Sequence, residues 1–195
     1  MGPIILDSMV RVPEHTLTPE QVRRIERSLT LRTPDMGDYG FGGRRTLHAY
    51  KRAGGYLAVP RNWEFARELL RHNRYEDRRA HGTPVTFNFT GKHREGQPEF
   101  IRRLHEGLLN DELGAIGQAA CGFGKTYCAV AIMALIGRAA LIVVHKEKLG
   151  KQFQKTCRTF LGIEVGWVQG KKCDWEGKEA VVITAQTLYQ REMPP

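Results

Sequence analysis

The stretch Ala119-Ala120-Cys121-Gly122-Phe123-Gly124-Lys125-Thr126 decides the fold of this chain. It has the form A-x-x-G-x-G-K-T, in which the glycines let the backbone curl so that its N–H groups face a phosphate. The ammonium group of Lys125 can reach the outer phosphates of a nucleoside triphosphate, and the hydroxyl of Thr126 can coordinate Mg²⁺. Lys125 and Thr126 are therefore the candidate catalytic residues. The loop residues expected to contact the nucleotide are Cys121, Gly122, Phe123, Gly124, Lys125 and Thr126.

The residues on both sides of this loop predict an α/β domain. Small residues at 115–120 indicate a strand before the loop, and the apolar run 126–136 indicates a helix after it. Strand and helix patterns then alternate to the end of the chain, which is typical of a parallel sheet with helices on both faces. The other expected strands are 85–89, 139–144, 163–168 and 180–184, and the other expected helices are 98–109 and 147–160.

The first 82 residues predict a separate small α+β domain. Thr18-Pro19-Glu20-Gln21 is a capping box, and apolar residues at helical spacing extend the helix to about residue 31. Residues 50–60 predict a strand pair that turns at Gly54-Gly55, and Asn62 is the expected cap of a second helix, 63–72. Polar residues at 78–84 indicate a boundary, so the expected domains are 1–82 and 83–195.

Composition narrows the classes of protein further. Of the residues, 41% are hydrophobic, which is enough to bury a core, and the net charge of +9 favours a polyanionic partner. The longest apolar stretch, 129–144, is interrupted by Gly137-Arg138 and is too short to span a bilayer. The four cysteines lack the spacing of a zinc or redox site. We therefore expect an intracellular, cytoplasmic protein with reduced thiols and no membrane partner.

Four elements, in order, resemble superfamily 2 DNA helicases. The segment Arg94-Glu95-Gly96-Gln97 resembles their adenine-recognising R-x-x-Q element, with His93 where leucine is usual, and Ala119 is common at the first position of helicase phosphate loops. Residues 141–153 (LIVVHKEKLGKQF) resemble motif Ia, and VGWVQGKK (165–172) and VVITAQTL (181–188) resemble the next two DNA-contacting elements. Residues 97–188 thus resemble the first RecA-like lobe of these enzymes, and most closely that of phage-encoded DNA helicases.

The resemblance implies an ATP-dependent DNA helicase or translocase, with Arg94 and Gln97 at the base of ATP. It also places DNA at the strand tips, because ligands bind at the carboxyl edge of a parallel sheet. Lysines and N–H groups there can hold phosphates without reading base sequence, although a solvated surface is the alternative for the lysines. The expected DNA-binding residues are His145, Lys146, Lys148, Gln169, Gly170, Lys171, Thr184, Gln186 and Thr187.

The acidic motif II of these helicases is not found in the sequence, which contains no D-E-x-H or D-E-x-D string. The family would carry it shortly after residue 195, so we expect an incomplete RecA-like lobe whose open sheet edge is the strand 180–184. The missing C-terminal helicase half is then a candidate partner. We expect the 195 residues alone to bind nucleotide without hydrolysing it, because phosphoryl transfer needs those carboxylates.

Two alternatives stay open at this stage. The chain could be another P-loop enzyme, or a DNA-binding or regulatory fragment that has lost catalysis. In the first domain, Arg44-Arg45, Lys51-Arg52, Arg61 and the arginines of the second helix either contact duplex DNA or form a solvated face.

Overall fold

The computed structural model describes residues 2–32, 46–111 and 114–190. These residues fall into two compact units, one up to Ala80 and one from His81 onward. Among the described residues, no helix has the length and apolar character needed to cross a membrane. The accessory role expected for residues 1–82, and the role of truncated ATP-binding lobe expected for 83–195, remain predictions.

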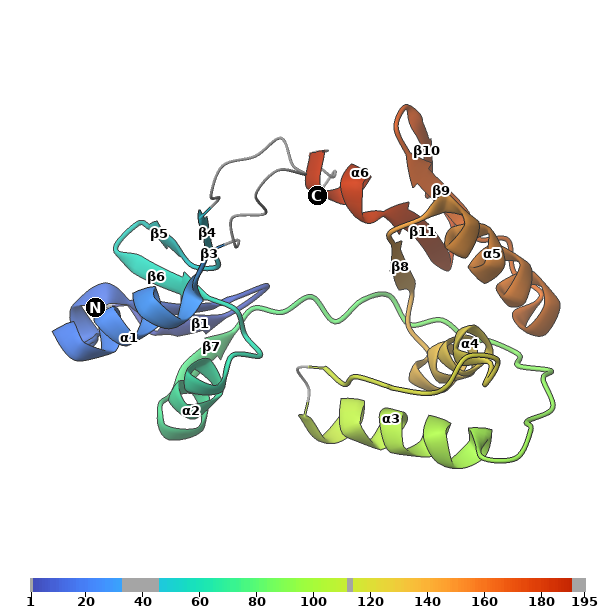
Figure 1. Ribbon diagram of the computed structural model, residues 1–195, viewed down its shortest axis with the longest axis horizontal. Coiled ribbons are helices and arrows are strands. Elements are labelled where there is room, and N and C mark those ends of the chain that lie inside the picture. Colours follow the sequence, from blue (N-terminus) through green and yellow to red (C-terminus); the bar gives the residue numbers. More distant parts are fainter. Residues whose placement is uncertain (1, 33–45, 112–113, 191–195) are drawn as a thin grey trace, which may run out of the picture. The chain divides into compact units, whose positions relative to one another are not determined.

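The first unit is built on a five-stranded sheet with the order β5-β6-β2-β1-β7 (Figure 1). All pairs are antiparallel except β1 with β7. Buried residues of the two helices, among them Ile25 and Phe65, join those of the strands in the core. The elements are β1 (Ile4–Leu6), β2 (Val10–Pro13), a 3-10 helix (Glu14–Thr16), α1 (Pro19–Leu29), β3 (Thr30–Arg32), β4 (Thr46–His48), β5 (Lys51–Ala53), β6 (Tyr56–Val59), α2 (Glu64–His72) and β7 (Tyr75–Asp77).

Local sequence patterns predicted α1, α2 and the β5–β6 pair of this unit, whereas β1, β2, β3, β4 and β7 were not predicted. The capping box is confirmed, because Thr18 Oγ1 accepts from the Gln21 N–H and Gln21 Oε1 accepts from the Thr18 N–H. The β5–β6 turn is confirmed as well, with positive φ angles of 58° and 78° at Gly54 and Gly55. The predicted Asn62 cap is wrong: Trp63 occupies the N-cap position of α2 and no side chain caps the helix. Arg44 and Arg45 lie outside the described residues.

The second unit is an α/β lobe, as the sequence predicts. Its sheet has the order β10-β9-β11-β8, in which β9, β11 and β8 are parallel and β10 is antiparallel to β9. The elements are α3 (Gln97–Asp111), α4 (Lys125–Ile136), β8 (Ala140–Val144), α5 (Glu147–Leu161), β9 (Gly166–Gln169), β10 (Lys172–Asp174), β11 (Ala180–Thr184) and α6 (Ala185–Gln190).

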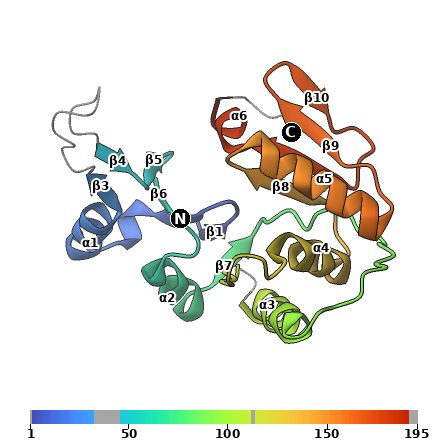
Figure 2. The same cartoon turned by 45° about the vertical axis from the view of Figure 1, so that its right-hand side comes forward.

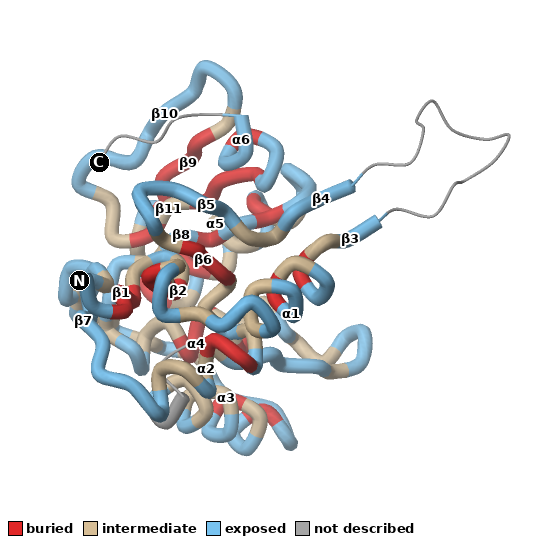
Figure 3. The backbone as a smooth tube through the Cα atoms, turned by 90° about the vertical axis from the view of Figure 1, so that its left-hand side faces the viewer, coloured by how far each residue is buried: buried red, intermediate tan, exposed pale blue. Residues whose placement is uncertain are grey.

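One apolar cluster joins this sheet to helices α4 and α5. Val130 of α4 and Cys157 of α5 pack with Ile142, Trp167 and Val182 of the strands. The tube in Figure 3 is buried along β9 and β11 and exposed along β10. On the other face of β8, Leu141 and Val143 are about half exposed. Helices α4 and α5 therefore cover the face of the sheet that carries Ile142 and Val182.

Two predicted strands, 85–89 and 115–120, are wrong. Residues 85–89 form no strand, although Val85 N–H donates to the Gly137 carbonyl and an isolated bridge pairs Pro84 with Arg138. Residues 115–120 form no strand and pair with no described strand, and Ile116 is 98% exposed. A strand exists only through hydrogen bonds to a neighbour, which a run of small residues does not guarantee.

The predicted sheet edge is also wrong. The strand expected at the open edge, β11, lies in the middle of the sheet between β9 and β8, and the edge is β8. Consecutive parallel strands need not be neighbours, because the crossover helix can return the chain to either side of an existing strand. The order of strands along the chain therefore did not give their order in the sheet.

Candidate nucleotide-binding site

The predicted phosphate loop has the backbone shape that phosphate binding needs. Gly122 has φ 78°, and Gly124 has φ 93° and ψ 37°, both in the left-handed region that favours glycine. Gly124 is the N-cap of α4, which begins at Lys125. The free N–H groups and dipole of this helix end attract an anion. The exposed loop therefore presents its amides at the start of α4.

The side chain of Lys125 is held over this loop by hydrogen bonds to backbone carbonyls of the loop. Its Nζ donates to the carbonyl oxygens of Ala119 and Ala120, each at 2.9 Å, while the side chain stays exposed. A phosphate at the loop would replace these neutral acceptors with charged ones, which form stronger hydrogen bonds. Thr126 follows in the first turn of α4 and is half-buried. The arrangement fits a triphosphate with its Mg²⁺ ion.

Gln97 is attached to the same loop, at the start of α3. Only 3% of the residue is exposed, its Oε1 accepts from the Arg94 N–H at 2.8 Å, and its Nε2 donates to the Phe123 carbonyl at 2.8 Å. A glutamine amide has two N–H groups and two acceptor lone pairs, so these two hydrogen bonds leave one N–H and one lone pair unused. The structure thus brings Arg94 and Gln97 to the loop.

Helix α3 also supports the phosphate loop, a role that was expected of a strand at residues 115–120. The Phe100 and Phe123 rings meet edge to face with centroids 5.2 Å apart. A Cβ added at Gly117 would come within 2.8 Å of both Leu104 and Phe100, so residues 115–117 lie directly along α3. Figures 1 and 2 show α3 beside α4. The described loop therefore gains its support from α3 rather than from the sheet.

An aromatic cluster behind this site was missed by sequence reasoning. Its rings are Phe89, His93, Tyr127 and Phe160, with centroids 5.0–6.0 Å apart. Tyr127 Oη and His93 Nδ1 are 2.9 Å apart, and burial raises the pKa of Tyr127. His93 stands where the helicase pattern has leucine, and its ring stacks on Phe89. A histidine at a position where leucine is usual was the sequence signal for this cluster. Through its contact with Tyr127, His93 links the residues before α3 to the start of α4.

The predicted DNA-binding residues follow strands that end at the same edge. Thr184 pairs with Val144 across β11 and β8, and Ile183 pairs with Val168 of β9. Just beyond these ends, the structure places polar groups from the β8–α5 connection, the start of α5, the β9–β10 turn and the start of α6. The exposed residues among them are His145, Lys146, Lys148, Gly170, Lys171 and Gln186.

Three of the predicted DNA-binding side chains are engaged within the protein. The hydroxyls of Thr184 and Thr187 are 2.8 Å apart and both residues are buried, so they join β11 to α6. Gln169 Oε1 accepts from Trp167 Nε1 at 3.0 Å. These contacts fix the backbone at the strand ends. A role of the three residues in binding DNA remains a prediction.

Comparison with known proteins agrees with this geometry. The family model described as "Type III restriction enzyme, res subunit" matches residues 90–193, more than half of the chain. The chain belongs to this family. The res-subunit family is a helicase-like domain of superfamily 2, so the resemblance is confirmed at that level. Domains of this type are ATPases that generally use ATP and Mg²⁺ and bind DNA. No curated protein matched the chain.

Proposed function

We propose that this chain is the front part of an ATP-dependent DNA helicase or translocase, with ATP bound at residues Cys121 to Thr126. The observation that carries the proposal is the loop itself. Lys125 Nζ lies 2.9 Å from two loop carbonyls, beside two glycines with positive φ at the start of α4. Lys125 would bind the outer phosphates, and the Thr126 hydroxyl would hold Mg²⁺.

The base of ATP would lie against Arg94 and Gln97. Because Gln97 already binds the Phe123 carbonyl, its remaining donor and acceptor would meet the adenine edge while the amide holds the loop in place. Base binding and phosphate binding would then depend on the same side chain. Cys121, which is exposed in the loop, would lie close to the phosphates.

DNA would bind at the strand-tip loops through its backbone. His145, Lys146 and Lys148 after β8 and Lys171 after β9 are exposed at one edge of the sheet. Lysines and turn amides bind phosphates without reading the bases. DNA binding would therefore be independent of base sequence and would weaken steeply with salt.

We further propose that the 195 residues alone bind ATP without turnover. The sequence has no D-E-x-H or D-E-x-D string to hold Mg²⁺ and position water, and nearly all acceleration of phosphoryl transfer comes from such charges. A C-terminal helicase half would supply them. The group that we propose is that of phage-encoded DNA helicases, on the resemblance of residues 143–153 and 165–192.

Binding of a fluorescent ATP analogue tests the site. We expect Lys125→Ala to weaken binding at least tenfold, because a charged hydrogen bond is worth about 1.5–3 kcal/mol, and Lys155→Ala, an exposed lysine on α5, to bind like the unaltered protein. Equal affinity of both variants would refute the nucleotide site.

Two further measurements complete the test. Single-stranded DNA binding should survive Lys125→Ala but fail for Lys146→Ala combined with Lys171→Ala, with Lys151→Ala plus Lys155→Ala as the matched control. A colorimetric phosphate assay with DNA should show no turnover. Robust hydrolysis would contradict the proposal that the 195 residues alone bind ATP without turnover.

A further inference from the structure

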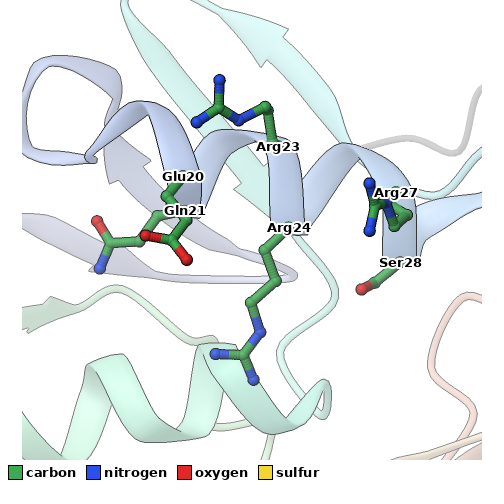
Figure 4. Close-up of a pocket in the computed structure, with 6 residues that line it drawn as sticks. All are labelled: Glu20, Gln21, Arg23, Arg24, Arg27 and Ser28. Carbon is green, nitrogen blue, oxygen red and sulfur yellow. The ribbon is translucent and has the colours of Figure 1, made fainter.

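The first unit carries a row of exposed arginines on one helix. Helix α1 buries Ile25 and Leu29 and turns Arg23, Arg24 and Arg27 outward (Figure 4). Arg23 and Arg27 are one turn apart, a rise of about 6 Å along the axis. Arg32 follows at the end of β3 and is also exposed. We call Arg23, Arg27 and Arg32 the α1 arginine strip.

The strip lacks acidic partners among the described residues, as do Arg61, Arg71 and Arg74 of the same unit. Other arginines of this unit form ion pairs, such as Arg11 with Asp7 at 2.6 Å and Arg52 with Glu26 at 2.9 Å. The three arginines of the strip form none with any residue that the structure describes. Their guanidinium groups therefore keep all five N–H donors available.

The two acids of α1, Glu20 and Glu26, line the strip surface but form no ion pair with the strip arginines among the described residues. Glu20 and Arg24 have the i,i+4 spacing that favours a pair on a helix. Arg24 instead lies over the Phe65 ring of α2, with its Cζ 4.9 Å from the ring centroid. In Figure 4, Arg24 extends toward α2 while Arg23 extends to the opposite side of the helix. Glu26, the other acid nearby, is already paired with Arg52.

Two shallow hollows make the strip continuous. One is lined by α1 alone, from Glu20 to Ser28, and the other by residues from Arg23 to Arg32. Arg23 and Arg27 line both hollows. Among the described residues, no aromatic side chain lines either hollow, so the hollows lack the stacking platforms of single-strand binding proteins. The surface suits a phosphate backbone whose bases are already paired.

The prevalence of arginine over lysine in the first unit also favours binding of a phosphate backbone. Lys51 is the only lysine among residues 1–90, where arginine supplies every other basic side chain, whereas residues 91–195 use both. Arginine presents a planar fork that binds phosphate oxygens in pairs, which lysine cannot do. A face that served solubility alone would not require this preference.

We propose that the α1 arginine strip binds the phosphate backbone of duplex DNA, as a second DNA surface separate from the strand-tip loops. The inference rests on DNA being the partner in the proposed function, and adds that the first unit grips the duplex. The proposed duplex contact does not involve the nucleotide site, so loss of the strip should leave ATP binding unchanged.

The test compares two variants of the full chain that lose the same charge. In the first, Arg23, Arg27 and Arg32 are changed to Gln. In the second, Arg102, Arg103 and Arg158 are changed to Gln; these exposed arginines of the second unit are ion-paired, and hydrogen bonds from Arg102 and Arg103 lower the pKa of Glu99 to about 2. Affinity for a duplex of mixed sequence is measured by fluorescence anisotropy at several salt concentrations.

We expect the strip variant to bind duplex at least tenfold more weakly, and its slope of log affinity against log salt to fall by about 2.7, at ~0.9 per phosphate contact. The control should keep both values, and both variants should bind the ATP analogue normally. Equal slopes in the two variants would overturn the proposal. So would unchanged duplex binding with lost binding to phosphatidylserine vesicles, which would assign the strip to a membrane surface instead.

Discussion

Replacing Gly124 by alanine should destabilise the second unit more than replacing Gly122, although both glycines have positive φ. A non-glycine residue in the left-handed region costs about 1–2 kcal/mol, and both variants carry that cost. At Gly122 an added Cβ meets nothing within 4 Å, whereas at Gly124 it would lie 2.7 Å from Gln97 Nε2. The hydrogen bond from Gln97 to Phe123 would then break, at a further cost of about 1 kcal/mol.

The expected free energies of unfolding are therefore lower by about 1–2 kcal/mol for Gly122→Ala and about 2–3 kcal/mol for Gly124→Ala. Denaturant unfolding in a Trp63→Phe background would measure them, because the remaining tryptophans, Trp167 and Trp175, lie in the second unit. In a Gln97→Ala background the two glycine variants should cost the same. Equal costs with Gln97 present would refute the argument that this side chain presses on the loop.

Three further predictions follow from the same unit. Gly150→Ala on α5 should destabilise by about 1–3 kcal/mol despite the better helix propensity of alanine, because its Cβ would meet the Trp167 ring at 2.6 Å. Lys155→Ala, at an exposed position of the same helix, is the comparison, and a more stable Gly150 variant would contradict the packing. Burial raises the pKa of Cys157 from 9.0 to about 11, so the folded state favours the protonated thiol. The contribution of this thiol to the free energy of unfolding should therefore be intact below pH 9 and lost as pH rises through 11. Denaturant unfolding of the unaltered protein and of Cys157→Ala across that pH range would show the loss. A thiol reagent should modify two cysteines quickly in the native protein and the other two only on unfolding, as followed by mass spectrometry; any other number of fast sites would contradict the burial, which exposes Cys121 and Cys173 and buries Cys128 and Cys157.

Much of the fold could be predicted because its signals are local. The capping box at Thr18 is four residues long, and β11 is bounded where the sequence predicts it, at Ala180–Thr184. Helices α4 and α5 differ from the predicted ranges by one residue at an end. Each of these elements depends on residues within its own span, so one sequence was enough to find it.

The failures concern partners that are distant in sequence. Nothing within residues 115–120 records whether another strand lies beside them, and nothing within β8 or β11 says which is the edge. The same holds at the site: the phosphate loop was evident from its glycines, but a hydrogen bond from Gln97 Nε2 to the Phe123 carbonyl joins α3 to a loop 26 residues away. The engagement of Thr184 with Thr187 likewise required the turn between β11 and α6 to be known.

The central place of β11 has a consequence for how the lobe is assembled. Both parallel neighbours of this strand, β8 and β9, precede it in the chain, and β11 meets β8 through the pair Ala140 and Ala180. A ribosome that adds 5–20 residues per second needs roughly 2–8 s to synthesise the intervening residues. Until β11 emerges, β8 and β9 have no parallel partner, and their apolar side chains are within reach of chaperones. Of the four described strands of this sheet, a central one is therefore synthesised last.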